Sequence, residues 1–197
     1  MSEWASDSVK KQFPDFVLET HRQHGDDTLL VSREGLVPIL EFLRDDPALD
    51  FCMPLDVTCV DRIGLSEPPE SETDPMNPML ATHTTPNLGE CDGPRFEVVY
   101  HLRSLSRGAM IRVKVRVEED DAVVPSGTAV LKGFNWFERE VYDMFGVRFS
   151  GHPDLRRMLL YPEFEGHPLR KDYPRKGYQP LMDMPNLDGD RVPGLEE

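Results

Sequence analysis

The sequence is poor in paired cysteines, long apolar runs and positive charge. Its 197 residues include three cysteines, Cys52, Cys59 and Cys91, without CxxC spacing, which argues against a disulfide framework, a zinc site or an iron–sulfur cluster. No apolar run is long enough to cross a bilayer, and the N-terminal residues predict no secretory signal. The 22 Lys and Arg against 36 Asp and Glu give a formal net charge of −14, which disfavours nucleic acid and anionic membranes as partners. This acidity fits protein partners, and simple solubility explains it equally well.

Catalytic patterns are missing as well. The sequence has no Gly-rich phosphate loop and no GxSxG motif. His21 and His24 are three residues apart but lie near a predicted hairpin turn, which favours solvated surface side chains over metal ligands. His152 and His167 have no thiol or carboxylate at the spacing of metal ligands. The acidic residues Glu138, Glu140 and Asp143 do not share one helix face, and local structure accounts for two of them. We therefore predict no catalytic residue, cofactor site or metal site in this chain.

Regular elements are indicated over the first sixty residues. Residues 5–13 fit a short helix that stops at Pro14, and residues 16–31 fit a β-hairpin. Ser32 is a plausible N-cap for a helix that buries apolar residues up to Leu43. Residues 51–61 then fit a strand on which Cys52 and Cys59 point to opposite faces.

The middle of the chain contains an insert and the clearest strand pattern. Residues 66–94 hold six Pro, six Asp or Glu and no Lys or Arg, which predicts a loop or disordered insert. Residues 96–102 and 111–117 both alternate apolar and polar side chains and are joined by a Gly-containing loop, so we expect a long antiparallel hairpin. Arg112, Lys114 and Arg116 form a basic stripe on it, either an ordinary solvated face or a docking surface.

A further helix is predicted over residues 135–145, after a short helical stretch between Pro125 and Gly133. Asn135 is expected to cap this helix, with Glu138 completing a capping box, and Gly146 to end it in the left-handed conformation. Arg139 and Asp143 lie four residues apart, which predicts an exposed ion pair.

Residues 147–197 follow with seven prolines, many aromatic residues and little periodicity, apart from a possible helical turn at residues 153–158. Such a segment favours an extended arm that wraps a partner and is ordered against it. The predicted class is α+β: a mostly antiparallel sheet packed with two to three helices, followed by a long extended C-terminal arm. We place an α+β domain at residues 1–146, with the insert at 66–94, and the arm at 147–197.

Three segments resemble a known family. NWFEREVYDMFGV at 135–147, GHPDLRRMLL at 151–160 and EGHPLRKDYP at 165–174 are similar to the 30 kDa subunit family of the NADH–quinone oxidoreductases, the respiratory enzymes of the complex I type. Upstream, residues 55–62, 95–105 and 111–117 resemble the central strands of that family. The insert departs from the family, in which we expect a shorter connection.

The resemblance implies a non-catalytic structural subunit, with no active site of its own, in the peripheral arm of the proton-pumping enzyme. It implies docking on the hydrogenase-large-subunit-like protein near the quinone site, beside other peripheral-arm subunits. FMN and iron–sulfur clusters would lie in partner subunits. The protein would be peripheral on the cytoplasmic side of the bacterial inner membrane and would reach the membrane only through the complex. The predicted interface residues are Arg139, His152, Arg156, Arg157, Arg170, Lys171 and Tyr173.

Two alternatives stay open at this point. One is the equivalent subunit of a membrane-bound [NiFe]-hydrogenase-type complex, which would copurify with nickel and hydrogenase activity instead of FMN and NADH activity. The other is a free-standing enzyme or an adaptor unrelated to respiration, which would lack association with a membrane complex.

Overall fold

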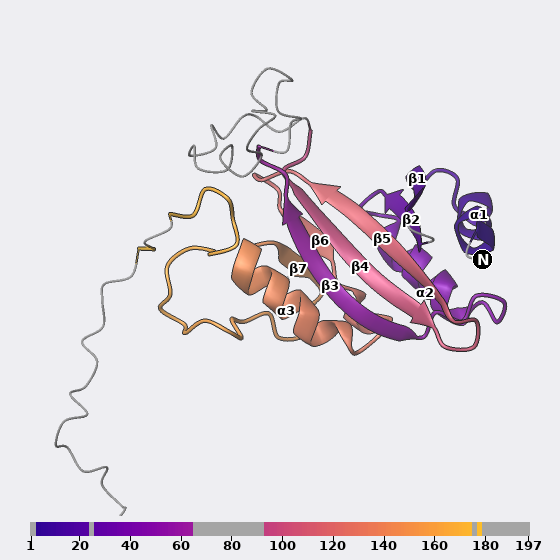
Figure 1. Ribbon diagram of the computed structural model, residues 1–197. Coiled ribbons are helices and arrows are strands. Elements are labelled where there is room, and N and C mark those ends of the chain that lie inside the picture. The colour runs from indigo at the N-terminus through magenta and orange to yellow at the C-terminus, as the bar shows by residue number, and fades with distance from the viewer. Residues whose placement is uncertain (1–2, 24–25, 65–92, 175–176, 179–197) are drawn as a thin grey trace, which may run out of the picture.

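A five-stranded mixed sheet forms the framework of the molecule (Figure 1). The computed structural model describes residues 3–23, 26–64, 93–174 and 177–178. Its strands are β1 (Val17–Gln23), β2 (Asp26–Val31), β3 (Met53–Asp61), β4 (Phe96–Ser104) and β5 (Ala109–Val117), arranged in the order β1-β2-β5-β4-β3. The sheet confirms the predicted α+β class. The predicted insert at 66–94 lies almost wholly outside the described residues.

Both predicted hairpins are present. Strands β1 and β2 pair antiparallel, and so do β4 and β5, with Tyr100 opposite Val113 and Val98 opposite Val115. These four side chains are buried on one face, as the apolar–polar alternation predicts. One pairing was not predicted: β2 runs parallel to β5, so the two hairpins join at the centre of the sheet.

The helices cover one face of the sheet and complete a single core. Helices α1 (Glu3–Gln12) and α2 (Leu36–Asp45) lie toward the β1–β2 end, and α3 (Phe134–Phe145) lies beside β3 (Figure 1). Their apolar sides join the inward face of β4 and β5 in one hydrophobic cluster. The helices therefore form because each has a sheet surface on which to bury its apolar stripe.

Between β5 and α3 the chain forms the strand β6 (Val123–Pro125) and a 3-10 helix, η2 (Gly127–Ala129). Strand β7 (Arg148–Ser150) follows α3 and pairs parallel with β6. The first residues of the predicted arm thus pair with the folded domain. The boundary of the arm stays a prediction, and residues 179–197 lie outside the described part of the chain.

Three local predictions were wrong. Helix α2 begins at Leu36 with Gly35 in the N-cap position, and the Ser32 hydroxyl accepts a hydrogen bond from the Gly35 N–H at 3.3 Å instead of capping the helix itself. Helix α3 begins at Phe134 after Gly133, so Asn135 is inside the helix. Residues 153–158, all of them described, form no helical turn.

The basic stripe of β5 is paired within the sheet. Lys114 and Arg116 both bind the buried carboxylate of Glu97, at 2.7 and 2.8 Å, and Arg112 binds Asp26 at 2.8 Å. Each cation therefore has a carboxylate on a neighbouring strand. A docking role for the basic stripe stays a prediction.

Candidate partner interface

Helix α3 is central to the candidate interface because it binds residues 151–174, which follow β7 and which we call the segment. Its apolar residues Phe134 and Val141 lie in the core, but Glu138, Arg139 and Asp143 are buried as well. Burying a charge is costly unless the group is paired or hydrogen-bonded. Each of these three side chains accordingly has partners inside the chain.

The Glu138 carboxylate is held between α3, β4 and η2. It accepts hydrogen bonds from the Tyr100 hydroxyl at 3.0 Å, the Ser126 hydroxyl at 2.6 Å and the Gly127 N–H at 2.7 Å. Burial raises the pKa of Glu138 to about 7, although all three hydrogen bonds act to lower it. The predicted capping box is therefore wrong, because this side chain points into the core and not back along the helix.

Asp143 binds the backbone of the segment after β7. Its Oδ2 accepts hydrogen bonds from the N–H groups of Met158, Leu159 and Leu160 at 3.0, 2.8 and 3.0 Å. Its Oδ1 binds the Arg157 guanidinium at 2.8 Å. Burial alone would raise the pKa of Asp143, but these donors hold it below its ordinary value. One carboxylate thus fixes three consecutive residues against the helix.

Arg139 makes the complementary contact to the same segment. Its guanidinium donates to the carbonyls of Arg156 and Arg157, both at 3.2 Å, and lies over the Trp136 ring at 5.0 Å. The predicted exposed ion pair between Arg139 and Asp143 is wrong, because both residues are buried and each binds the segment separately.

Two histidines also bind helix carbonyls. His152 Nε2 lies 3.1 Å from the carbonyl of Asn135, and its Nδ1 accepts the N–H of Asp154 at 3.1 Å. His167 Nδ1 lies 2.9 Å from the carbonyl of Asp143. These contacts join the segment to both ends of α3.

The end of α3 requires glycine. Gly146 has a φ of +78°, and a Cβ placed there would lie 2.5 Å from His167 Nε2. Arg170 closes over the same corner, where its Nε donates to the Phe145 carbonyl at 2.6 Å. A left-handed C-cap and close packing therefore both exclude a side chain at this position.

A cluster of ion pairs around Arg95 joins the segment to the sheet. The buried Arg95 guanidinium binds Asp61 at 2.8 Å, Glu119 at 2.6 Å and Asp172 at 2.9 Å, and Asp61 also accepts the N–H of Lys171 at 3.0 Å. Sequence reasoning missed this cluster, because its members are scattered over more than a hundred residues and no spacing links them.

Of the seven predicted interface residues, Arg139 lies on α3 and the other six lie on the segment after it. Arg139, Arg157 and Arg170 bind carbonyls or a carboxylate of this chain, and His152 binds α3, as described above. The other three are Arg156, whose side chain is 74% exposed beside Asp154, the exposed Lys171, and Tyr173, which stacks on Phe164. Contact of any of the seven with a partner stays a prediction.

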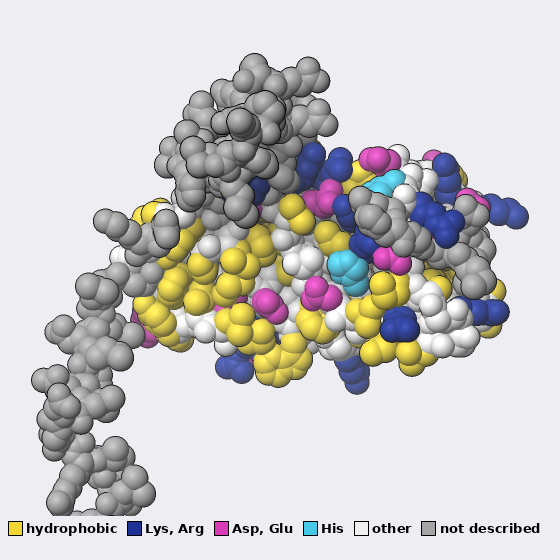
Figure 2. Space-filling view, viewed as in Figure 1, with side chains coloured by type: hydrophobic (Ala, Val, Ile, Leu, Met, Phe, Trp, Pro, Cys, Tyr) yellow, Lys and Arg dark blue, Asp and Glu magenta, His cyan; other side chains and the backbone are white. Residues whose placement is uncertain are grey.

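Large apolar side chains are exposed on the same part of the molecule. Trp136 on α3 is 60% exposed, and Leu159, Tyr161 and Leu169 on the segment are 59, 40 and 53% exposed. We call these four residues the exposed apolar face. Figure 2 shows hydrophobic side chains gathered over α3 and the segment after it. Apolar clusters of this kind mark surfaces that other proteins cover.

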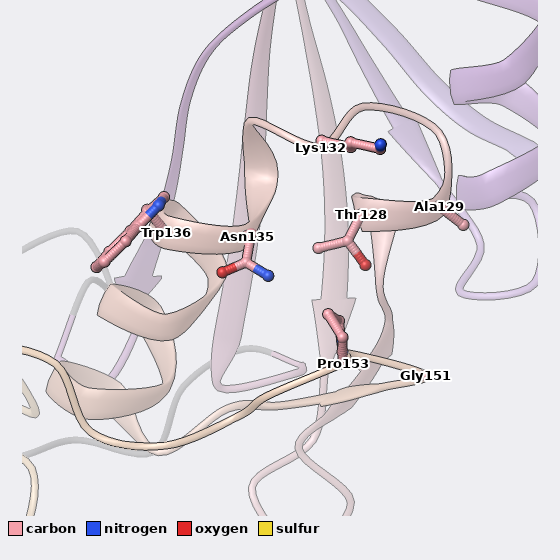
Figure 3. Close-up of a pocket in the computed structure, with 7 residues that line it drawn as sticks. All are labelled: Thr128, Ala129, Lys132, Asn135, Trp136, Gly151 and Pro153. Carbon is pink, nitrogen blue, oxygen red and sulfur yellow. The ribbon is translucent and has the colours of Figure 1, made fainter.

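A pocket of about 540 Å³ opens at the start of α3 (Figure 3). Asn135 and Thr128 point into the same space from α3 and η2, while Lys132 and Pro153 lie at its edges.

In the described part of the chain no group of three or more His, Cys, Asp or Glu side chains is arranged to hold a metal ion. None of the described helices has the length and apolarity needed to cross a membrane.

Comparisons with known proteins agree on one family. The family model for the 30 kDa subunit of respiratory-chain NADH dehydrogenase matches residues 29–179. A subunit of the NADH-quinone oxidoreductase of Hyphomonas neptunium is 40% identical over 170 residues, which are 86% of this chain and 70% of that protein. The corresponding protein of Trichlorobacter lovleyi is 38% identical over 173 residues, 88% of this chain and 90% of its own.

Two solved structures share the fold. A trypsin-resistant fragment of Nqo5 is 26% identical, with a TM-score of 0.55 over 78% of this chain and 98% of that one. A chain in the membrane-bound sulfane sulfur reductase, an archaeal respiratory membrane complex, has a TM-score of 0.62 over 97% of this chain and 99% of its own. The second is 21% identical, so this likeness concerns the fold alone.

Proposed function

The chain belongs to the 30 kDa subunit family of respiratory-chain NADH dehydrogenase, the NADH-quinone oxidoreductase of complex I, and from this premise we propose that it is a non-catalytic structural subunit of the peripheral arm. In this role it docks on the hydrogenase-large-subunit-like protein near the quinone site of a proton-pumping complex. It supports electron transfer from NADH to quinone by holding its neighbours in place, and carries no redox group itself.

The same proposal assigns the remaining components to other subunits. FMN and the iron–sulfur clusters belong to partner subunits of the peripheral arm. The chain lies on the cytoplasmic side of the bacterial inner membrane and reaches the membrane through the complex. Its partners are the hydrogenase-large-subunit-like protein and other peripheral-arm subunits, and nucleic acid is not among them.

The observation that carries the proposal is the contrast between the buried charges and the exposed apolar face. Glu138, Arg139 and Asp143 are occupied in holding the chain itself together, through the hydrogen bonds described above. The same structure leaves Trp136 and Leu159 more than half exposed. A rigid support with an apolar outer surface suits a protein that is covered by a partner.

This contrast divides the predicted interface residues into two roles. Arg139, Arg157 and Arg170 shape the interface by fixing the segment to α3. Arg156 and Lys171 offer their charges outward, where Arg can hold a partner carboxylate through two parallel hydrogen bonds.

A native pull-down tests the proposal. The chain carries an N-terminal tag in its source organism, and the membranes are solubilised gently. We expect flavin, iron–sulfur clusters, a hydrogenase-large-subunit-like protein and NADH–quinone reductase activity in the eluate. Recovery of nickel and hydrogenase activity would assign the chain to the other type of complex, and recovery of no membrane complex would overturn the proposal.

Matched variants test the exposed apolar face within that experiment. Leu159→Ser combined with Leu169→Ser should reduce the recovered complex, because both side chains lose apolar area that a partner buries. Leu105→Ser is the control, because Leu105 is 63% exposed at the β4–β5 turn, away from α3. The free energy of unfolding, measured in urea, should change little for either variant. Equal recovery from both would count against a docking role for this face.

A further inference from the structure

We propose that the pocket at the start of α3 receives a carboxylate side chain, flanked by an apolar residue, from a polypeptide segment of a partner protein in the complex. The inference rests on the proposed function, because it assumes that the chain works inside a complex. It adds a location and a chemistry that the exposed apolar face alone does not supply.

The pocket combines apolar walls with polar groups that lack partners. Lys132, Asn135 and Trp136 line it together with Ala129 and Pro153. Among the described residues, none forms an ion pair with the Lys132 ammonium, and none accepts from the Asn135 carboxamide or the Trp136 indole N–H. The Lys132 ammonium and the Asn135 carboxamide therefore border a pocket of about 540 Å³ and have no acceptor among the described residues.

Charge decides which acceptor fits. The chain has a formal net charge of −14, yet the charged residue that lines this pocket is a lysine. Other cations nearby are already paired, Arg157 with Asp143 and Arg156 with Asp154. A carboxylate can accept from an ammonium such as that of Lys132 and from an amide N–H such as that of Asn135. One cation is too few for a nucleic-acid backbone, which needs several basic contacts.

The apolar part of the pocket suits the residue next to the carboxylate. Trp136 is 60% exposed, although a ring of this size gains much from burial. Ala129 and Pro153 offer further apolar surface across the pocket. Tryptophan at the edge of a pocket is a frequent anchor of protein interfaces.

The pocket is held in shape before any partner arrives. Arg139 lies over the Trp136 ring at 5.0 Å and is itself fixed by two backbone carbonyls. His152 holds the Gly151–Pro153 edge to α3 through the carbonyl of Asn135 at 3.1 Å. A preformed site loses little conformational entropy on binding.

Photo-crosslinking in the intact complex tests the occupant. The photoreactive amino acid p-benzoylphenylalanine replaces Ala129 in the tagged full-length chain, and membranes of the source organism are irradiated before purification. We expect a crosslinked peptide from another protein of the complex that contains Asp or Glu beside an apolar residue. Crosslinks only within this chain, only to lipid, or to a peptide without a carboxylate would overturn the proposal.

Charge reversal tests the recognition itself. Lys132→Glu should lower the partner proteins recovered per tagged chain by about fivefold or more, since it replaces an attraction with a repulsion, whereas Lys132→Arg should retain them. Lys11→Glu, an exposed lysine on α1, is the matched control. Exchanging the crosslinked partner carboxylate for lysine should restore recovery with Lys132→Glu.

The outcomes separate the two proposals. If the wild-type chain recovers NADH–quinone reductase activity but Lys132→Glu recovers as much partner as Lys11→Glu, the pocket proposal fails and the proposed function stands. If the wild-type chain recovers no respiratory complex, the proposed function fails.

Discussion

The buried Glu138 carboxyl makes the stability of the domain depend on pH in a defined direction. Burial raises its pKa from 4.5 to about 7. A raised carboxyl pKa means that the folded state holds the proton more tightly than the unfolded chain. The stabilisation is therefore complete below the unfolded pKa and is lost as the pH rises through the folded pKa.

The size of the effect follows from the two pKa values. The difference of about 2.5 units, at about 1.4 kcal/mol per unit, gives up to about 3 kcal/mol between acidic and alkaline conditions. Glu138→Gln removes the ionisation. Its amide oxygen can still accept from the Tyr100 hydroxyl and the Gly127 N–H, and its amide N–H can donate to the Ser126 hydroxyl.

Urea unfolding of the purified wild-type chain and the Glu138→Gln variant, from pH 5 to pH 9, measures this. The two should have similar unfolding free energies near pH 5, and the variant should be more stable by roughly 2–3 kcal/mol near pH 9. Other titrating groups are common to both proteins and cancel in the difference. A difference that does not change with pH would show that folding does not raise the pKa of Glu138.

Three further substitutions test the contacts around α3 by the same unfolding measurement. Asp143→Asn should lower the unfolding free energy by about 3 kcal/mol, because it leaves the Arg157 guanidinium without its carboxylate. Gly146→Ala should lower it by about 2 kcal/mol or more through its positive φ and the clash with His167; an unchanged value would contradict the assigned C-cap. Arg157→Ala should cost several times more than Arg156→Ala, and equal losses would contradict the assigned contacts.

The strands of this fold could be predicted from the sequence because each has one buried face. The alternation along residues 96–102 and 111–117 reports that face directly, and the observed register agrees with it. No comparable pattern in the sequence predicts the parallel pairing of β2 with β5. It depends on how two hairpins meet, and the alternation is the same for either direction of pairing.

The candidate interface itself stays a prediction, but the contacts around it differ from those that local sequence rules predict. The resemblance pointed to α3 and the segment after it, on which all seven predicted residues lie. The roles of Glu138, Arg139 and Asp143 were wrong at the level of contacts, because local rules pair them with residues three or four positions away. Their actual partners include backbone N–H and carbonyl groups up to eighteen residues away, and any sequence supplies such groups.

The pocket at the start of α3 had no signal in the sequence. Its lining comes from η2, α3 and the chain after β7. The sequence around Lys132 and Asn135 contains no pattern that predicts a pocket. What distinguishes them is the lack of a partner for their side chains among the described residues, which only the folded arrangement reveals.

We propose that this chain, without an active site of its own, is required for quinone reduction by a larger enzyme. The direct measurement is NADH–quinone reductase activity in membranes of the source organism after deletion of this chain, with and without a plasmid-borne copy. We expect loss of activity on deletion, recovery with the copy and no activity from the purified chain alone. Full activity in the deletion strain would contradict this proposal.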